Sequence, residues 1–354
     1  MFQMTPRHYK NISDTYLNIE YYKKSISGLL FPLQLPSTAG GASSPTVNVG
    51  NVQNSGLDIA ATFHDAIGQD FKFSIGANIT SYKNKITKLV DPGYFDLFGG
   101  SRIGSFVREQ VGQPIGEFFG YQTKGIYQNA SQVASLPGYS GAAAGSYIYQ
   151  DVNGDGKIDA NDRTFIGNPN PDFTYGVNLN ASYKGFDFSM VLYGSYGNKD
   201  FNYVKYWTDT YHSFPGGKDI DLLTNSAIVS GGVVTNPSAT QPAVAFNQTL
   251  GAGIPSTFYV ESGSFLKCRV AQIGYTFDPG ILKAVGVSKL HVYVQGTNLF
   301  TITKYSGLDP ELVPSVNNLN QGGSQPQQSA STGVDWGAYP NNQKTYLIGV
   351  NMTF

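Results

Sequence analysis

Residues that alternate between apolar and polar dominate the chain, and the three- and four-residue spacing of an amphipathic helix is scarce. In the segment 71–80 the odd-numbered residues are apolar or small, from Phe71 to Ile79, and the even-numbered ones are mostly polar. Side chains of a strand point alternately to its two faces, so this pattern predicts a strand with one apolar face. Runs of this kind predict eight strands, at about residues 15–25, 55–63, 71–80, 177–183, 186–195, 265–277, 289–301 and 344–354.

The connections between these runs alternate strictly in length. Three are short, at residues 64–70, 184–185 and 278–288, and four are long, at about 27–54, 83–171, 205–262 and 303–342. Outer-membrane barrels place short turns on the periplasmic side and long loops outside, whereas a soluble sandwich has no reason to separate them. We therefore expect an all-β, antiparallel transmembrane barrel with eight spanning strands. The strand-like segment 115–128 is expected in an extracellular excursion, unless residues 83–171 contain two further spans.

The amino-acid composition also agrees with strands that turn one face to a solvent other than water. Only 13% of the 354 residues are charged, 14% are aromatic, Gly numbers 42, and the net charge is −1. The sparse Lys and Arg exclude a typical nucleic-acid binder, and a single Cys excludes a disulfide framework or a multi-cysteine metal site. The apolar runs are too short for a transmembrane helix.

Two cations on one predicted span test the membrane interpretation. Lys267 and Arg269 continue the outward face of residues 271–277, and a cation on the lipid face costs about 2–4 kcal/mol at the bilayer midplane but only about 0–1 kcal/mol near its edge. Lys267 would lie at that edge. Either Arg269 extends its charge to the interface, or a bulge between residues 269 and 271 reverses the face.

The last run ends the chain on an aromatic residue. One face carries Tyr346, Ile348, Val350, Met352 and Phe354. Outer-membrane barrels typically end in this way, and we interpret these five residues as the signal that the barrel assembly machinery reads. The alternative is an ordinary edge strand that happens to end in Phe.

Residues 151–162 match the pattern of a 12-residue calcium loop. Side chains at positions 1, 3, 5, 9 and 12 and the carbonyl at position 7 supply the oxygen ligands of such a loop, around a glycine at position 6. These correspond to Asp151, Asn153, Asp155, Asp159, Asp162 and the carbonyl of Lys157, around Gly156. We predict a weak structural Ca²⁺ site that fixes the long excursion, because Asp162 is shorter than the usual Glu. The alternative is a Gly/Asp-rich turn with no ion.

Both Trp residues fall in predicted extracellular loops. Trp336, with Tyr339 nearby, and Trp207 offer ring faces that stack on a substrate such as a sugar. Trp336 could instead pack on a partner protein, and Trp207 could belong to the aromatic girdle at the membrane interface. The four His residues are scattered, and no nucleophile elbow, phosphate loop or HExxH motif occurs, so we predict no enzymatic activity.

Six segments together resemble the C-terminal barrel portion of SusC-like TonB-dependent outer-membrane transporters. They lie in the family's order over nearly the whole chain, at residues 48–58 (NVGNVQNSGLD), 112–128 (GQPIGEFFGYQTKGIYQ), 151–175 (DVNGDGKIDANDRTFIGNPNPDFTY), 258–277 (FYVESGSFLKCRVAQIGYTF), 292–309 (VYVQGTNLFTITKYSGLD) and at the terminal Phe354.

This resemblance implies a 22-stranded barrel with an N-terminal plug in the outer membrane of a Gram-negative bacterium. It also implies a SusD-like surface lipoprotein as a lid, and import of glycan fragments, or peptides, driven by TonB. The chain departs from the pattern because we expect it to lack the signal peptide, the TonB-contact segment and the plug, and because eight spans make about a third of such a barrel. We therefore expect a C-terminal segment, 1–354, of a TonB-dependent receptor barrel.

Two other interpretations remain open from the residues alone. One is a secreted all-β, calcium-containing carbohydrate-binding protein, which would be soluble without detergent. The other is a small outer-membrane barrel of eight strands that closes on its own.

Overall fold

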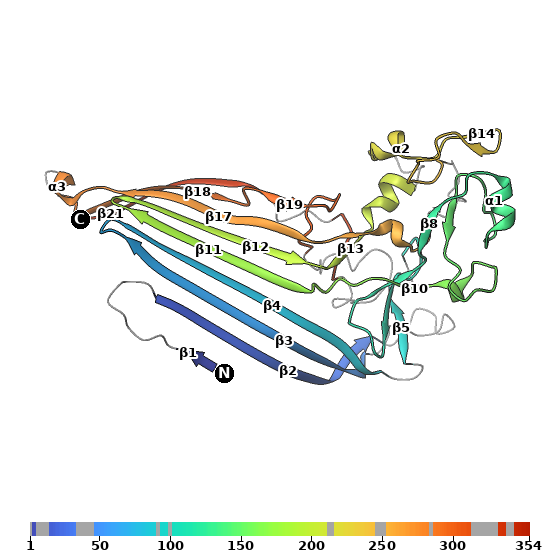
Figure 1. Ribbon diagram of the computed structural model, residues 1–354, viewed down its shortest axis with the longest axis horizontal. Helices are drawn as coiled ribbons and strands as arrows, with labels where there is room; N and C mark the ends of the chain where they lie inside the picture. The colour runs from blue at the N-terminus through green and yellow to red at the C-terminus, as the bar shows by residue number, and fades with distance from the viewer. Residues whose placement is uncertain are drawn as a thin grey trace.

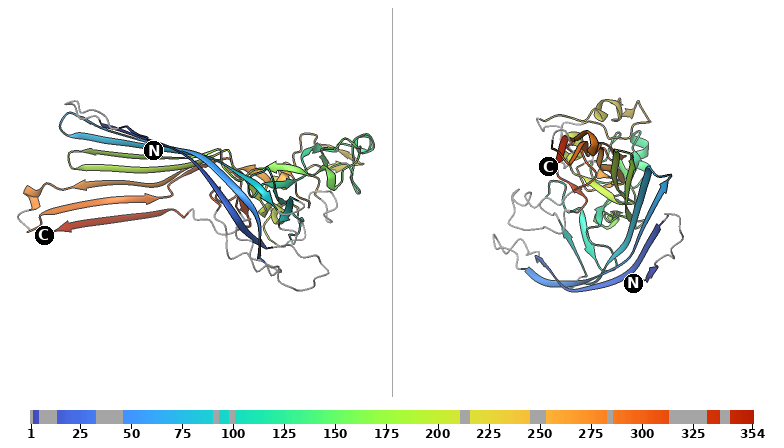
Figure 2. Two further views of the ribbon diagram at one scale, coloured as in Figure 1. Left: turned by 90° about the horizontal axis from the view of Figure 1, so that it is seen from below. Right: turned by 90° about the vertical axis from the view of Figure 1, so that its left-hand side faces the viewer.

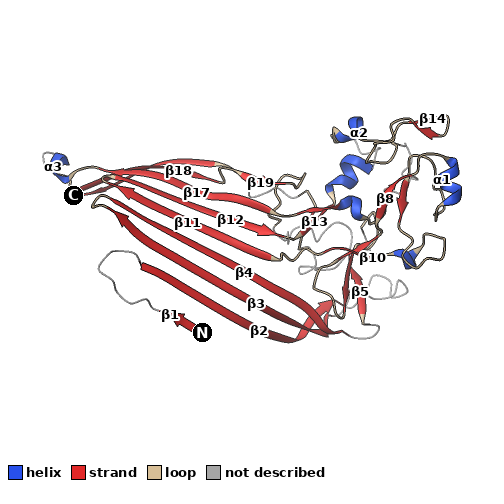
Figure 3. Ribbon diagram, viewed as in Figure 1, coloured by secondary structure: helices blue, strands red, loops and turns tan. Residues whose placement is uncertain are grey.

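The computed structural model describes residues 2–4, 14–32, 46–89, 93–97, 101–210, 216–244, 253–282, 286–312, 332–337 and 343–354. It has two parts, a long curved sheet and a smaller domain of loops and short strands at one end of that sheet (Figure 1). No helix in the described ranges is long and apolar enough to cross a membrane. Figure 3 shows that the helices lie in the loop domain, apart from the short α3 at the far end of the sheet.

The long sheet is antiparallel and has the strand order β1-β2-β3-β4-β11-β12-β17-β18-β21, with β19 also paired to β17. Seen along its length, it forms an open trough (Figure 2). Its strands are β1 (Phe2–Met4), β2 (Asp14–Pro32), β3 (Thr46–Ile67), β4 (Phe71–Leu89), β11 (Phe173–Tyr183), β12 (Phe186–Tyr196), β17 (Phe265–Thr276), β18 (Lys289–Thr297), β19 (Thr301–Thr303) and β21 (Thr345–Thr353).

Eight of these strands are long, and they coincide with the eight predicted spans. The predicted connection 27–54 is wrong at both ends, because β2 continues to Pro32 and β3 begins at Thr46. The error has a physical reason. The register of β2 against β3 shifts twice between Ser27 and Leu30, so the alternation ends while the ladder of backbone hydrogen bonds continues.

The loop domain consists of small sheets and short helices. The sheets are β5 (Tyr94–Leu97), β6 (Val107–Gln110), β7 (Phe118–Gly120) and β10 (Thr164–Gly167); β8 (Thr123–Ile126) with β9 (Tyr147–Tyr149); β13 (Lys199–Asn202), β16 (Val260–Ser262) and β20 (Val334–Asp335); and β14 (Val229–Ser230) with β15 (Val233–Val234). The helices are α1 (Ala130–Ser135), α2 (Asp221–Thr224) and α3 (Pro279–Leu282), with 3₁₀ turns at Ala160–Asp162 and Thr257–Tyr259 and a π-helical turn at Tyr206–Thr210.

The described strands of the excursion 83–171 after β4 pair only with one another and not with the long sheet. The segment 115–128 supplies β7 and β8 to these small sheets. The predicted start of the excursion at residue 83 is wrong, because β4 continues to Leu89. The described residues after β4 form part of the loop domain and add no described span.

The outward face of the long sheet carries an apolar band between two rows of aromatic residues. Directly paired residues share a face, and one such row across β2, β3 and β4 is Ile19, Ile59 and Ile79. Tyr183 and Phe186 lie at the end near the short turns, whereas Phe173 and Tyr196 stack at 5.0 Å at the other end. About ten residues separate the rows, which corresponds to a rise of about 25 Å for a strand tilted by about 40°. This is the height of the apolar band of an outer-membrane barrel.

Tyrosine rings lie over glycines that directly face them on the neighbouring strand. Tyr175 faces Gly194 and Tyr293 faces Gly349 in the register of the sheet. A Cβ at Gly194 would approach the Tyr175 ring to 2.3 Å, and one at Gly349 would approach the Tyr293 ring to 2.2 Å. Only glycine leaves room for the ring here, so the abundance of Gly and Tyr is partly explained by cross-strand pairs.

The register between β12 and β17 shifts at Arg269. Val191 pairs with Val270 but Leu192 pairs with Cys268, so Arg269 is the extra residue of a bulge. The bulge reverses the faces, as one of the two predicted alternatives required. Lys267 is accordingly fully buried, and its Nζ lies 2.9 Å from both carboxylate oxygens of Asp309.

Candidate functional site

Three long connections meet at β13, at the junction between the long sheet and the loop domain. The strand pairs antiparallel with β16 and parallel with β20. The Lys199 amide also donates to the Asn168 carbonyl at 2.8 Å, and the Phe201 amide donates to the Gly333 carbonyl at 2.7 Å. Residues from the excursion 83–171, from the connection after β12 and from the connection after β19 are thus tied to one four-residue strand.

An aromatic cluster packs on one side of β13. Phe201 is fully buried and stacks on Phe106 at 4.3 Å and on Tyr259 at 5.3 Å. Phe118 and Tyr203 belong to the same cluster. Such rings contribute most of the apolar area that a small domain buries, so the loops have a core of their own.

Both predicted substrate-contacting Trp residues lie at the edge of this aromatic cluster. Trp336 packs against Tyr203 at 4.7 Å, and Trp207 packs edge-on against Tyr206 at 5.0 Å. The guanidinium of Arg102 lies 5.1 Å from the Trp207 ring. Both Trp side chains are half-buried. Trp207 lies in the π-helical turn and outside the long sheet, so it is not part of the membrane girdle. Tyr339 lies outside the described residues.

The other side of the junction is a buried polar network. Its carboxylates are Asp200, Glu261, Asp309, Glu311 and Asp335, and its cations are Lys205, Lys267 and Arg269. Lys205 pairs with Glu261 at 2.8 Å, and Arg269 pairs with Glu311. The Tyr305 hydroxyl donates to Asp335 at 2.6 Å. The network joins the top of the long sheet to two of the loops.

Asp200 is the carboxylate of the polar network whose charge is least balanced by hydrogen-bond donors and cations. Its side chain is 1% exposed, one carboxylate oxygen lies 3.4 Å from the donor Nδ2 of Asn198, and the other has no hydrogen-bond partner in the described chain. Burial, reinforced by the charges of Asp335, Glu261 and Asp309, raises the pKa of Asp200 to about 8. Asp200 is therefore protonated at neutral pH. Glu261 behaves differently, because burial would raise its pKa but Lys205 and Ser306 hold it below the ordinary value.

Two further carboxyl groups lie at the sheet formed by β5, β6, β7 and β10, the buried Glu109 on β6 and the half-buried Glu117 directly before β7. Glu109 is 1% exposed and accepts a hydrogen bond from the Gly116 amide at 3.0 Å. Burial raises the pKa of Glu109 to about 7, and burial also raises the pKa of Glu117 to about 7. These groups therefore hold protons near neutral pH.

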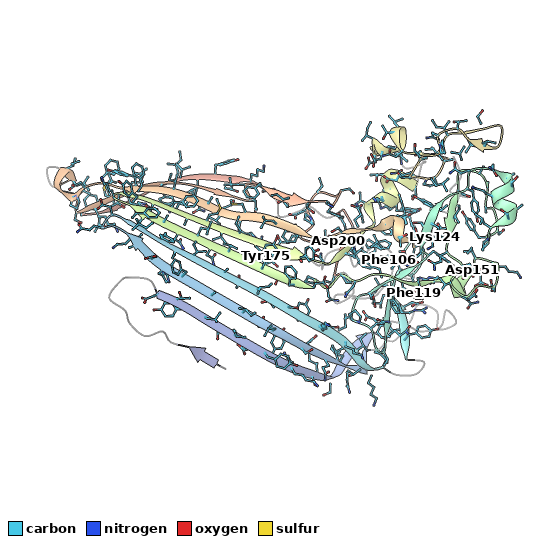
Figure 4. The ribbon with its side chains drawn as sticks, viewed as in Figure 1. Phe106, Phe119, Lys124, Asp151, Tyr175 and Asp200 are labelled. Carbon is cyan, nitrogen blue, oxygen red and sulfur yellow. The ribbon has the colours of Figure 1, made fainter. Side chains whose placement is uncertain are left out.

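The predicted calcium loop lies at the far end of the loop domain from Asp200 (Figure 4). Asp151 accepts from the Gly154 amide at 2.6 Å and the Gly156 amide at 2.8 Å, and both glycines have positive φ angles. Asn153 and Asp155 likewise cap the amides two residues further on. The chain therefore wraps around its own side-chain oxygens, which is possible because glycine adopts this conformation without strain.

Asp162 closes the calcium loop from inside. It is fully buried and accepts from the amides of Val152 and Asp159, each at 2.8 Å. Burial raises its pKa, but these hydrogen bonds outweigh burial and hold the pKa below the usual value. Across the described ranges, no three His, Cys, Asp or Glu side chains are placed to hold a metal ion. The oxygen donors of the loop suit Ca²⁺ in kind, and the ion stays a prediction.

The predicted assembly signal lies at the opposite end of the molecule. Tyr346, Ile348, Val350 and Met352 pair with Gly296, Val294, Val292 and Leu290 of β18. Their side chains are 48–77% exposed, and Phe354 is 84% exposed. The first four lie on β21 and Phe354 follows directly after it, and their recognition by the assembly machinery stays a prediction.

Sequence reasoning missed the polar network. Its one detectable signal was Lys267, a cation that fitted poorly on a lipid-facing strand. Asp309 and Glu311 lie more than forty residues away, so no local pattern connects them to Lys267.

Comparison with known proteins gives relatives along almost the whole chain. TonB-dependent receptor P3 of Formosa agariphila is 32% identical over 344 residues, covering 96% of this chain and 32% of the relative. TonB-dependent receptor SusC of Bacteroides thetaiotaomicron is 27% identical, covering 95% of this chain and 30% of the relative. No protein-family model matches. The chain spans about a third of the length of these curated relatives.

Solved structures agree on the fold. The RagAB peptide transporter matches with a TM-score of 0.72 at 20% identity, and the closed-closed state of the RagAB peptide importer matches with a TM-score of 0.71 at 22% identity. Each match covers 96% of this chain and 33% of the solved chain. The long sheet thus has the fold of a portion of these solved chains.

Proposed function

From the homology of this chain to SusC-like TonB-dependent receptors, we propose that it is part of an active importer in the bacterial outer membrane. The importer takes up glycan fragments or peptides beneath a SusD-like lid lipoprotein and is energised by TonB. The named relatives are receptors and transporters, and we assign the barrel no bond-making chemistry.

The observation that carries this proposal is the position of the loop domain relative to the apolar band. One end of the long sheet has short turns, such as residues 68–70, and the other end carries a domain with a buried aromatic cluster. A purely structural barrel needs no such domain. A folded rim on the extracellular side supports a role in holding cargo and a lid.

We propose that the aromatic edge formed by Trp336 and Trp207, with Tyr339, contacts cargo. The two Trp rings are held by Tyr203 and Tyr206 while keeping part of their surface exposed. An aromatic face fixed in this way stacks on a sugar ring or a peptide side chain at little entropic cost.

The experiment uses the full-length transporter expressed with its lipoprotein. A panel of oligosaccharides and peptides is tested for binding to the purified complex and for uptake by cells with and without TonB. We expect one class to bind, TonB to be required for uptake, and Trp336→Ala to weaken binding at least tenfold. Tyr196→Phe, in the membrane girdle, is the control. Uptake that is unchanged in cells without TonB would contradict the proposal.

We also propose that the loop 151–162 holds one structural Ca²⁺ ion. Asp151, Asn153, Asp155, Asp159, Asp162 and the carbonyl of Lys157 would bind it, and the ion would fix the far end of the loop domain. Support comes from the spacing of the oxygen donors and from the turn, in which Gly154 and Gly156 bend the chain around Asp151.

A further inference from the structure

Three rows of residues above the apolar band form a surface distinct from the proposed cargo site. The register across β2, β3 and β4 places Lys23, Ser55 and Lys83 in the first row, Ser25, Gln53 and Lys85 in the second, and Ser27, Asn51 and Lys88 in the third. Four of these nine positions are Lys and none is acidic. We call Lys23, Lys83, Lys85 and Lys88 the lysine band.

The lysine band shares its face with the lipid-contacting residues. The row below it is Tyr21, Leu57 and Ser81, and the row below that is Ile19, Ile59 and Ile79. Tyr21 is 71% exposed, as expected for an aromatic residue at the membrane interface. The charges therefore begin one row above the aromatic boundary.

The opposite face of the same strands is turned toward the loop domain. Val52 and Ile86, which pair with each other, are 3% and 2% exposed. The Ile115 amide donates to the Asn84 side chain at 2.8 Å, and the Ile86 amide donates to the Gln113 carbonyl at 2.8 Å. The lysine band consequently faces outward, away from the lumen and from the loops.

The lysines have no ion-pair partner among the residues that the structure describes. All four side chains are exposed. Four unpaired cations on one face repel one another and favour an external anion.

The depth of the lysine band matches that of lipid headgroups. Two residues of a strand tilted by about 40° rise about 5 Å, so Lys23 and Lys83 lie about 5 Å above the Tyr21 row and Lys85 about 10 Å above it. The headgroup layer adds about 5–8 Å on each side of the hydrocarbon. Flexible lysine side chains cover the remaining distance.

We propose that the lysine band binds the phosphate groups of anionic lipid headgroups in the outer leaflet around the barrel. Charge complementarity and continuity with the lipid-facing surface favour a lipid over a protein partner. The site is independent of the cargo and of the lid.

The test uses the full-length transporter purified in a neutral detergent. Binding of lipid A with two phosphates, and of lipid A with one, is measured by native mass spectrometry for the wild type and for the variant Lys23→Gln/Lys83→Gln/Lys85→Gln/Lys88→Gln. Each lysine near a charged headgroup contributes about fivefold in affinity, so we expect at least a tenfold loss for diphosphoryl lipid A. The same four positions changed to Arg retain binding.

The matched control replaces four exposed lysines elsewhere: Lys24, on the other face beside Lys23, with Lys72, Lys124 and Lys289. It should bind lipid A like the wild type. Heat-modifiable mobility in gel electrophoresis establishes that each variant folds, and the double variant Lys23→Gln/Lys83→Gln gives a second, milder test.

Three results would overturn the proposal. The first is equal affinity of the wild type and the Gln variants for diphosphoryl lipid A. The second is a loss of lipoprotein co-purification while lipid binding is unchanged, which would make the band a protein interface. The third is displacement of lipid A by an equal concentration of inorganic phosphate, which would make it a site for a free anion.

Discussion

The long sheet and the loop domain bury their apolar residues in opposite ways. In the sheet, Ile273 and Ile348 are 56% and 77% exposed, whereas Phe106 and Phe201 in the loop domain are fully buried. The sheet keeps its regularity through backbone ladders and turns its apolar side chains outward, where lipid replaces a core. The loop domain packs aromatic residues from three connections as a water-soluble domain does. The long sheet thus folds in contact with lipid and the loop domain in contact with water, so substitutions should have different consequences in the two parts.

Truncating the centre of the aromatic cluster should have the largest effect. Phe201→Ala removes a ring stacked on Phe106 and Tyr259, and such a change in a packed core costs about 3–5 kcal/mol. We expect the loop domain to become sensitive to protease and rapid in hydrogen exchange while the barrel stays heat-modifiable. Phe186→Ala, which removes a half-exposed ring from the lipid face, is the matched change in the sheet and should leave the loops protected. Equal loss of loop protection in both variants would remove the distinction.

A charge on the lipid face should have the next largest effect. Val177 and Asn178 lie midway along β11 on opposite faces. Val177→Arg places a cation near the bilayer midplane and should lower the free energy of unfolding by about 2–4 kcal/mol. Asn178→Arg at the same depth points inward and should change it far less. Folding titrations into lipid bilayers measure both values, and a similar loss in the two variants would mean that the faces are wrongly assigned.

The polar network should make the loop domain dependent on pH. The pKa of Asp200 is raised to about 8, mainly by burial, so the folded protein binds a proton more tightly than the unfolded chain does. This contribution is fully present below the ordinary aspartate pKa and is lost as the pH rises through about 8.

We therefore expect protection of β13 and its neighbours against hydrogen exchange to fall between about pH 4 and pH 8, after correction for the intrinsic exchange rate. Asp200→Asn should flatten that decline near β13. Glu109 and Glu117, whose pKa values are about 7, would still contribute around β6 and β7. A decline near β13 that is as steep in the variant as in the wild type would show that another group is responsible.

Removal of calcium should have the smallest effect. Asp155→Ala, or chelation, is expected to loosen residues 151–162 and to leave the barrel and the aromatic cluster intact. Limited proteolysis of the loop with and without chelator measures the difference. Asn161→Ala, within the loop but outside the predicted ligands, is the control. Unchanged protease sensitivity in Asp155→Ala and after chelation would leave a turn without an ion.

The sequence predicts the sheet better than the loops, and the reason lies in the two solvents. Each residue of a spanning strand faces either lipid or the lumen, so apolar and polar residues alternate, as they do from Phe71 to Ile79. This pattern can be read within a short stretch of sequence. The halves of β2 and β3 next to the loop domain lose this signal because register shifts interrupt the alternation, although the ladder between the strands continues. The contacts of Phe201 and Lys267 join segments that are distant in the sequence, and no periodicity reports them.

The candidate sites divide in the same way. The calcium-type loop and the terminal strand are contiguous in sequence and could be proposed from spacing. Trp207 and Trp336 could be singled out by residue type, but not their common support on Tyr203 and Tyr206. Asp200 gave no signal, because burial within three converging loops is what alters its chemistry.

The central claim, that one face of the long sheet contacts lipid and the other does not, is tested most directly by an accessibility scan along β4. Single cysteines at residues 72–79 of the full-length transporter, in a Cys268→Ala background, are spin-labelled in bilayers, and their accessibility to oxygen and to a water-soluble nickel complex is compared. We expect high oxygen accessibility at Phe73, Ile75, Ala77 and Ile79 and high nickel accessibility or low oxygen accessibility at the residues between them. A scan without this two-residue alternation would contradict the account.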